Sequence, residues 1–325
     1  MAESKVLHWG ILGCGRISND FVRALKNCEH PNQVHAVATS DSKQRADKFV
    51  SDTFGLEDCK QIKGYGSYAE LLNDPKIDVV YIGLLNHQHK QAVLDALDAE
   101  KHRSSKWFTK LSKKKKFLME AYWTRFFPAW RDMPDLMQQI GEAETVLCDF
   151  GFEVTRVNKT ELSWGGGFLL ATGCYPIMCY WSSGDKKTDV WGSVTLEYSG
   201  NRVANLFYSG LSCTPCQCSV SGPEGHLKMP EYFWCPSKVV KEIKGSPSTT
   251  LQFPIAGAEN LRNYIYPNSS GLCYEADHVY ECLQQGKLES DVMSLKESIL
   301  LAEIFDEIRQ QIGCIIYKIN KNKPN

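Results

Sequence analysis

Short apolar runs alternate with amphipathic helical patterns in the first third of the chain. Residues 6–12, 34–39 and 78–83 form continuous apolar runs, which are typical of strands buried on both faces. Ile17, Phe21, Val22 and Leu25 recur at helical spacing after the first run, and a similar pattern follows Asn86. Strands alternating with helices predict an α/β fold with a doubly wound parallel sheet of the Rossmann type.

From residue 117 onward the pattern becomes rich in strands. Strands are predicted at residues 117–121, 145–152, 189–198, 202–209, 216–220 and 250–254, with a hairpin turn at 199–201. Two helices close the chain, one at 274–284 and one that begins at the capping box formed by Ser294 and Glu297. We therefore predict residues 1–122 as one domain of the Rossmann type. Residues 123–325 are predicted as an α+β domain built on a mostly antiparallel open sheet.

Composition narrows the class of protein without identifying it. The chain has 325 residues, 43% hydrophobic and 23% charged, with a formal net charge of −1. This is ordinary for a globular protein and gives no general attraction to nucleic acid or to an anionic membrane. The thirteen cysteines are an odd number, and no signal peptide precedes them, so we expect reduced thiols and a cytoplasmic protein.

Two local features could indicate other partners. Residues 101–116 are rich in lysine and arginine, as in a nucleic-acid patch or a localisation signal, but a solvated loop explains them better. Cys213, Cys216 and Cys218 lie close together, but no second Cys/His pair stands at zinc-finger spacing. The sequence therefore predicts no nucleic acid, no membrane and no metal as partners.

The most informative motif is the turn after the first strand. Gly13, Cys14 and Gly15 lead into a helix that begins near Arg16 and Ile17, with Ser18 at the third glycine position of Gly-x-Gly-x-x-Gly. Bare backbone and the free N–H groups of a helix start can bind a pyrophosphate. We expect these five residues, 13–17, to bind the coenzyme, and a tight turn without a ligand is the alternative.

The residues after the second strand bear on which coenzyme is bound. Such folds read the adenosine ribose at this position, and an acidic residue there repels a 2′-phosphate. Ser40 with Lys43 and Arg45 could hold that phosphate, whereas Asp41 argues against it. These residues favour NADP weakly, and NAD stays open.

Asn86 and His89 stand where the third strand gives way to a helix, at the carboxyl edge of the sheet. Ligands bind at that edge, so both residues are candidates for coenzyme binding. A capping or surface role is the simpler alternative for His89.

Several colinear segments together resemble the Gfo/Idh/MocA oxidoreductases, and within them the dimeric dihydrodiol dehydrogenases. The segments are residues 9–18, 65–68, 81–89, 117–129, 165–175, 233–236, 274–282 and 303–313. The resemblance implies that residues 1–122 are a dinucleotide-binding Rossmann domain that takes NADP. It implies that residues 123–325 bind the substrate and that their open sheet pairs two chains into a homodimer. It also implies hydride transfer between the nicotinamide and a hydroxyl-bearing carbon of a polyol, an aldose or a cyclic diol.

The resemblance also assigns roles to single residues. Tyr81 and His89 match residues associated with coenzyme binding, and Trp123 and Arg125 would line the pocket near the nicotinamide. Tyr175 matches a residue that contacts the alcohol, which makes it the candidate catalytic group. Ser40 stands where relatives place an arginine for the 2′-phosphate.

The chain departs from the family at the proposed proton-transfer groups. No Glu-Lys-Pro segment exists, and Ala171 stands where relatives carry an aspartate. The space between His102 and Phe117 is too short for the usual strand and helix, so we expect the parallel sheet to lose a strand. A wrongly assigned exon would leave the same gap.

Two interpretations follow from this loss. The chain is either an NADP-dependent dehydrogenase or a catalytically impaired relative that binds dinucleotide or serves as a dimerising partner. Lys106 or Lys110 could replace the missing lysine if the shortened segment reaches the nicotinamide.

Overall fold

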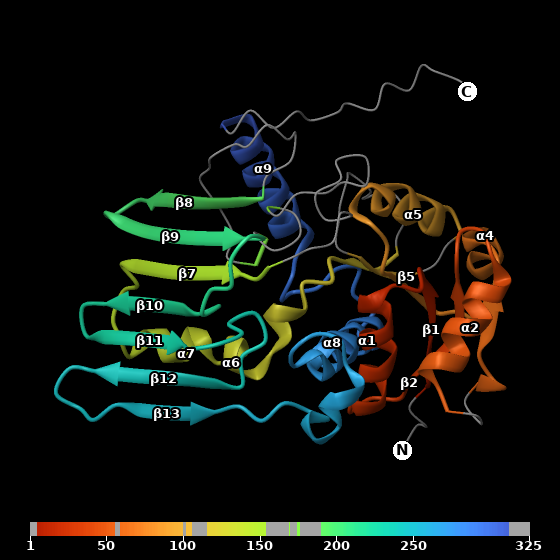
Figure 1. Cartoon of the computed structure of the whole chain (residues 1–325), viewed down its shortest axis with the longest axis horizontal. Helices are drawn as coiled ribbons and strands as arrows, with labels where there is room; N and C mark the ends of the chain where they lie inside the picture. Colours follow the sequence, from red (N-terminus) through yellow and green to blue (C-terminus); the bar gives the residue numbers. More distant parts are fainter. Residues whose placement is uncertain are drawn as a thin grey trace.

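Two sheets organise the molecule, and they lie side by side in the computed structural model (Figure 1). The structure describes residues 5–55, 59–99, 102–105, 116–153, 169, 174–175 and 190–311. Within these ranges, no helix combines the length and the apolar character needed to cross a membrane.

The N-terminal sheet has six parallel strands in the order β3-β2-β1-β4-β5-β6, as in a Rossmann fold. Its elements are β1 (Leu7–Leu12), α1 (Arg16–Ala24), η1 (Leu25–Asn27), β2 (Asn32–Ala38), α2 (Lys43–Thr53), β3 (Lys63–Tyr65), α4 (Tyr68–Leu72), β4 (Val79–Ile82), α5 (Asn86–Asp98), β5 (His102–Ser105) and β6 (Leu118–Met119). The predicted strands and helices of this half are confirmed, and the short β3 was missed.

The expected loss of a strand was wrong. β5 pairs with β4 along its whole length, from Val79 opposite His102 to Ile82 opposite Ser105, and it also pairs with β6. The prediction required a strand of about five residues followed by a helix. β4 itself has only four residues, so a four-residue neighbour completes the ladder and the sheet stays continuous.

Helices cover both faces of this sheet, as a doubly wound fold requires. Trp9 and Ile11 of β1 face the core that contains Phe21 of α1 and Val50 of α2. Leu12 faces a second core, formed with residues of α4 and α5. The alternation of β1 therefore divides its side chains between the two layers.

The C-terminal sheet has seven strands in the order β13-β12-β11-β10-β7-β9-β8. They are β7 (Thr145–Gly151), β8 (Trp191–Tyr198), β9 (Arg202–Ser209), β10 (Cys218–Gly222), β11 (Gly225–Met229), β12 (Lys238–Ile243) and β13 (Thr249–Gln252). All neighbours are antiparallel except β7 and β9, which confirms a mostly antiparallel open sheet. Sequence reasoning missed β11 and β12. The predicted hairpin joins β8 and β9 through Gly200 and Asn201, both with positive φ.

The remaining helices connect and cover the two sheets. They are η2 (Trp123–Phe126), α6 (Pro128–Arg131), α7 (Met133–Gln138), η6 (Ala258–Asn263), η7 (Ser269–Gly271), α8 (Leu272–Gln284) and α9 (Leu295–Gln311). The predicted capping box opens α9, since the Ser294 hydroxyl accepts from the Glu297 N–H while the Glu297 carboxylate accepts from the Ser294 N–H.

A buried carboxylate joins the two halves. Asp20 of α1 is fully buried and accepts hydrogen bonds from the N–H groups of Ile265 and Tyr266 and from the Ser269 hydroxyl. α8 packs against α1 beside this contact, so one core runs through both halves. The boundary between residues 122 and 123 stays a prediction.

Candidate functional site

The turn between β1 and α1 requires glycine at its first position. Gly13 has φ +94°, and its N–H donates to the Ala38 carbonyl over 3.0 Å. A Cβ there would lie 2.6 Å from the Leu84 side chain and 2.8 Å from the Gly83 oxygen. A side chain at residue 13 would therefore separate β1 from the turn after β4.

The first turn of α1 offers its N–H groups to an anion. Gly15 precedes the helix, is exposed, and provides no side-chain cap, and no acidic residue occupies the first turn. A Cβ at Gly15 would come no nearer than 3.7 Å to another atom, so its backbone can be approached closely. Ser18, at the third position of the motif, is fully buried against Gly83, where only a small residue fits. Together, these features fit a pyrophosphate at the helix start.

The rim beyond β2 carries charged groups that are already paired. Ser40 is exposed there, and the Arg45 guanidinium lies 2.8 Å from the Asp41 carboxylate. The Lys43 ammonium lies 2.7 Å from Asp47. All four charged side chains are about half or more exposed, so these pairs contribute little stability and can exchange partners.

β4 and the start of α5 lie on the other side of the glycine turn. The Tyr81 ring is buried and stacks on Phe21, with centroids 3.8 Å apart. A Cβ on Gly83 would lie 3.1 Å from a ring carbon of Tyr81, so the Tyr81 ring lies directly beside Gly83. His89 is only 3% exposed, and its Nε2 lies 2.8 Å from the Leu84 carbonyl. Because Nε2–H donates to that carbonyl, His89 fixes the turn that precedes its own helix. Asn86 is the first residue of α5.

Two aromatic side chains from distant segments meet on the C-terminal side. The indole Nε1–H of Trp123 donates to the Tyr175 hydroxyl over 3.1 Å. The Tyr175 ring also packs 5.5 Å from Phe150 of β7 and 5.6 Å from Tyr122. Since an indole can only donate, the phenol oxygen is the acceptor, and its own proton points to another group.

Comparisons with known proteins agree with this arrangement. The family model of the Gfo/Idh/MocA oxidoreductases, described as an oxidoreductase family with an NAD-binding Rossmann fold, matches residues 7–103. Trans-1,2-dihydrobenzene-1,2-diol dehydrogenase of Xenopus laevis is 34% identical, covering 94% of this chain and 98% of that protein. The enzyme of the same name from Sus scrofa is 35% identical, covering 94% and 97%. The chain belongs to the Gfo/Idh/MocA oxidoreductase family.

Solved structures show the same fold at lower identity. Aldose-aldose oxidoreductase from Caulobacter crescentus, in complex with glycerol, has a TM-score of 0.74 at 18% identity, covering 94% of this chain and 98% of that chain. A 3-ketoreductase from Actinomadura kijaniata, in complex with NADP and TDP-benzene, has a TM-score of 0.73 at 20% identity, with the same coverage. The chain is therefore an oxidoreductase with an NAD-binding Rossmann fold, and it is related to the dihydrodiol dehydrogenases.

Three more residues of the predicted coenzyme motif contact different parts of the molecule. Cys14, next to Gly13, has its thiol 3.9 Å from the Ala38 carbonyl, and Ile17 is half-buried in the first turn of α1. The Arg16 guanidinium lies 5.1 Å above the Tyr266 ring, so it bridges to the C-terminal half.

Arg125 is positioned differently from the aromatic pair. Its guanidinium donates to the Val292 carbonyl over 3.2 Å and to the Glu297 carboxylate over 2.8 Å. Arg125 therefore fastens η2 to the segment before α9 and to α9 itself. Its expected contact with the nicotinamide stays a prediction.

One residue of the site region was missed by sequence reasoning. Glu275 of α8 is 1% exposed, and neither of its carboxyl oxygens has a hydrogen-bond partner among the residues that the structure describes. Burial raises the pKa of this carboxyl to about 8. Burial also raises the pKa of Tyr81, and the negative charge of Glu275 adds to that shift. Helical periodicity could have placed Glu275, because Leu272, Val279 and Cys282 lie on the same face.

Lys106, Lys110 and Ala171 lie outside the described residues, as does most of the lysine-rich stretch. Of the three clustered cysteines, only Cys218 lies in a strand, whereas Cys216 precedes it with φ +56°.

Proposed function

We propose that the chain is an NADP-dependent dehydrogenase that transfers hydride between the coenzyme and a hydroxyl-bearing carbon of a cyclic diol or an aldose. The uncapped first turn of α1 behind Gly13 is the observation that carries this proposal, since it fits a pyrophosphate. The names of the relatives support the substrate class, because they are dehydrogenases of a cyclic diol.

The bound coenzyme would supply the hydride acceptor, and the chain would hold the substrate and move its proton. In the reducing direction, the Tyr175 O–H would donate its proton to the oxygen of the carbonyl that becomes the alcohol. Trp123 holds the phenol by donating to its oxygen, which fixes the direction of that proton. Gly13, Gly15 and the first turn of α1 would hold the pyrophosphate.

We propose NADP rather than NAD because two cations follow Ser40 at the rim. Their partners, Asp41 and Asp47, are exposed carboxylates, and a 2′-phosphate could replace them as the anion. Fluorescence titration should give a lower Kd for NADPH than for NADH. Arg45→Ala should weaken NADPH binding about tenfold and leave NADH unchanged, because one charge-assisted hydrogen bond is lost.

Lys48→Ala is the matched control, since Lys48 is an exposed cation of the same helix that pairs with Asp52. If Arg45→Ala raised the Kd values for NADPH and NADH equally, the proposed contact between Arg45 and the 2′-phosphate would be contradicted. If the folded chain binds neither coenzyme, the function shifts to a dimerising partner without catalysis.

We also propose a homodimer formed through the open face of the C-terminal sheet. This face carries a hollow of about 410 Å³, lined by Leu147 and Phe207 together with Asn205 and Lys228. Leu147 is 51% exposed in the single chain. An interface commonly combines apolar and polar side chains in this way, and a two-fold axis would pair this face with the same face of a second copy.

Light scattering after size exclusion should give the mass of two chains. Leu147→Glu should shift the protein to the mass of one chain, since it would place two carboxylates near the centre of the interface. Leu300→Glu, at an exposed leucine of α9, should leave the dimer intact. A native chain with the mass of a monomer would exclude this interface.

A cytoplasmic location is also proposed. Among the cysteines that the structure describes, none is joined to another by a disulfide, as expected in a reducing compartment. Thiol titration of the native protein from its own cells would reveal disulfides if this location were wrong.

A further inference from the structure

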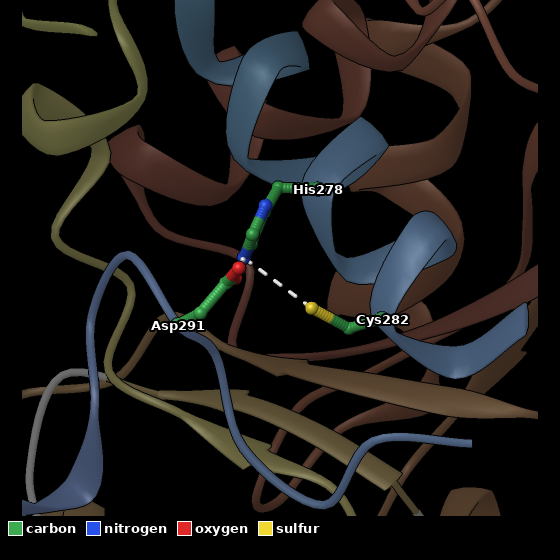
Figure 2. A group of neighbouring side chains, drawn as sticks. All are labelled: His278, Cys282 and Asp291. Carbon is green, nitrogen blue, oxygen red and sulfur yellow. Dashed lines mark hydrogen bonds and ion pairs between the residues drawn. The ribbon is translucent and has the colours of Figure 1, made fainter. Parts of the chain in front are cut away.

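Three potential metal ligands converge outside the coenzyme site. His278 and Cys282 lie one turn apart on α8, and Asp291 reaches them from the segment between α8 and α9 (Figure 2). One nitrogen, one sulfur and one oxygen atom of these side chains all lie within 4.8 Å of one another. Within the described part of the chain, no other three His, Cys, Asp or Glu side chains bring their ligand atoms this near to one another.

Two of the three distances between the ligand atoms match edges of a tetrahedron around zinc, and the third, between sulfur and oxygen, lies within 4.8 Å. The His278 Nε2 lies 3.3 Å from the Cys282 Sγ and 3.5 Å from an Asp291 carboxylate oxygen. Zinc–ligand bonds of about 2.0–2.3 Å at tetrahedral angles place nitrogen and sulfur about 3.6 Å apart, and nitrogen and oxygen about 3.4 Å apart. The ligand atoms therefore need only small shifts to enclose an ion.

The hydrogen bonds indicate that His278 presents a lone pair at Nε2. The Ser290 hydroxyl oxygen accepts from the N–H groups of Val292 and Met293. Its own proton is therefore the one that reaches His278 Nε2 over 2.8 Å. A nitrogen that accepts here is neutral imidazole, the form that binds metals.

The remaining contacts leave the site accessible from one side. Cys282 is 1% exposed and forms the inner wall, whereas the Asp291 side chain is 65% exposed. Asp291 pairs with Lys287 over 3.3 Å, an exposed contact that a divalent ion can replace. Solvent on that side can provide a fourth ligand.

We propose that His278, Cys282 and Asp291 bind one zinc ion, with water as the fourth ligand. Thiolate, imidazole and carboxylate together suit Zn²⁺ better than Mg²⁺ or Ca²⁺. On binding, the thiol releases its proton, the hydrogen bond from the Ser290 hydroxyl to His278 Nε2 breaks, two zinc–ligand bonds form to α8 and one forms to the segment that follows it. No atom changes its oxidation state.

The ion would strengthen a segment that already holds β6 and η2 through hydrogen bonds. Leu288 accepts a hydrogen bond from Leu118 of β6, and Val292 accepts one from Arg125 of η2. A metal bridge between α8 and Asp291 would hold these acceptors in place. This role is structural and does not depend on the proposed function.

Cobalt titration of the chelator-treated full chain tests the site. One equivalent of Co²⁺ should produce a thiolate-to-cobalt charge-transfer band and visible bands of tetrahedral cobalt, and one equivalent of Zn²⁺ should abolish both. Zinc at 100 times its Kd should also raise Tm by about 5 °C.

The variants separate the site from adventitious binding. Cys282→Ser should abolish the charge-transfer band, and Cys213→Ser, at an exposed thiol elsewhere, should retain it. Because Cys282 is buried, Asp291→Asn provides a second test at an exposed side chain and should weaken cobalt binding at least tenfold. The proposal is overturned if the native chain gives no band, if the band survives Cys282→Ser, or if Asp291→Asn binds cobalt as tightly as the native chain.

Discussion

Tyr175→Phe is expected to lower kcat/KM for diol oxidation with NADP by about 10²- to 10⁴-fold, the usual contribution of a group that transfers the substrate proton. The phenol lies against Trp123, Phe150 and Tyr122, so phenylalanine retains the packing and removes only the hydroxyl. The Kd for NADPH should not change. Steady-state kinetics with a trans-dihydrodiol and with D-xylose, together with the fluorescence titration, measure both quantities.

Two further variants distinguish Tyr175 from its rivals. Trp123→Phe removes the donor to the phenol oxygen and should have a smaller effect on kcat than Tyr175→Phe. Lys106→Ala with Lys110→Ala tests whether a lysine of the shortened segment moves the proton. If the double lysine variant loses turnover and Tyr175→Phe does not, the proton carrier is a lysine.

Glu275→Gln should remove a pH dependence of stability worth about 5 kcal/mol. Burial raises the pKa of Glu275 to about 8 from an ordinary value of 4.5, and each pKa unit corresponds to about 1.4 kcal/mol. Since the folded chain holds the proton more tightly, this group stabilises it fully below pH 4.5. That contribution falls as the pH rises towards 8.

Glutamine keeps the shape of the side chain and cannot ionise. The free energy of unfolding of the native chain should therefore fall by about 5 kcal/mol relative to Glu275→Gln between pH 4.5 and pH 8, as measured by urea denaturation. Glu281→Gln, at a half-exposed glutamate of the same helix, is the control. Parallel pH curves for the native chain and Glu275→Gln would show that this carboxyl is solvated.

The glycine turn between β1 and α1 could be predicted from the sequence because its causes are local. Gly13 supplies a positive φ, Gly15 leaves the helix start bare, and Ser18 is small enough to pack against Gly83. Each requirement depends on residue type and spacing within one strand, turn and helix, which is the information that periodicity carries.

β5 shows where local reasoning failed. The sequence between His102 and Phe117 does not resemble an apolar strand. The segment also looked too short to hold the usual strand and helix. His102–Ser105 nevertheless forms a strand, because β4 on one side and β6 on the other offer unpaired backbone groups that must be satisfied. That demand exists only once the sheet is assembled.

The sequence by itself determined the Rossmann half, the strand-rich C-terminal half and the family, since these depend on periodicity and on motifs within short segments. Only the tertiary structure decided which distant side chains meet. It placed Tyr175 on Trp123, turned Arg125 to Glu297, and buried Glu275 without a partner. Such contacts depend on how helices and sheets pack across the whole chain, and side-chain burial and hydrogen bonding are set there rather than by neighbours in sequence.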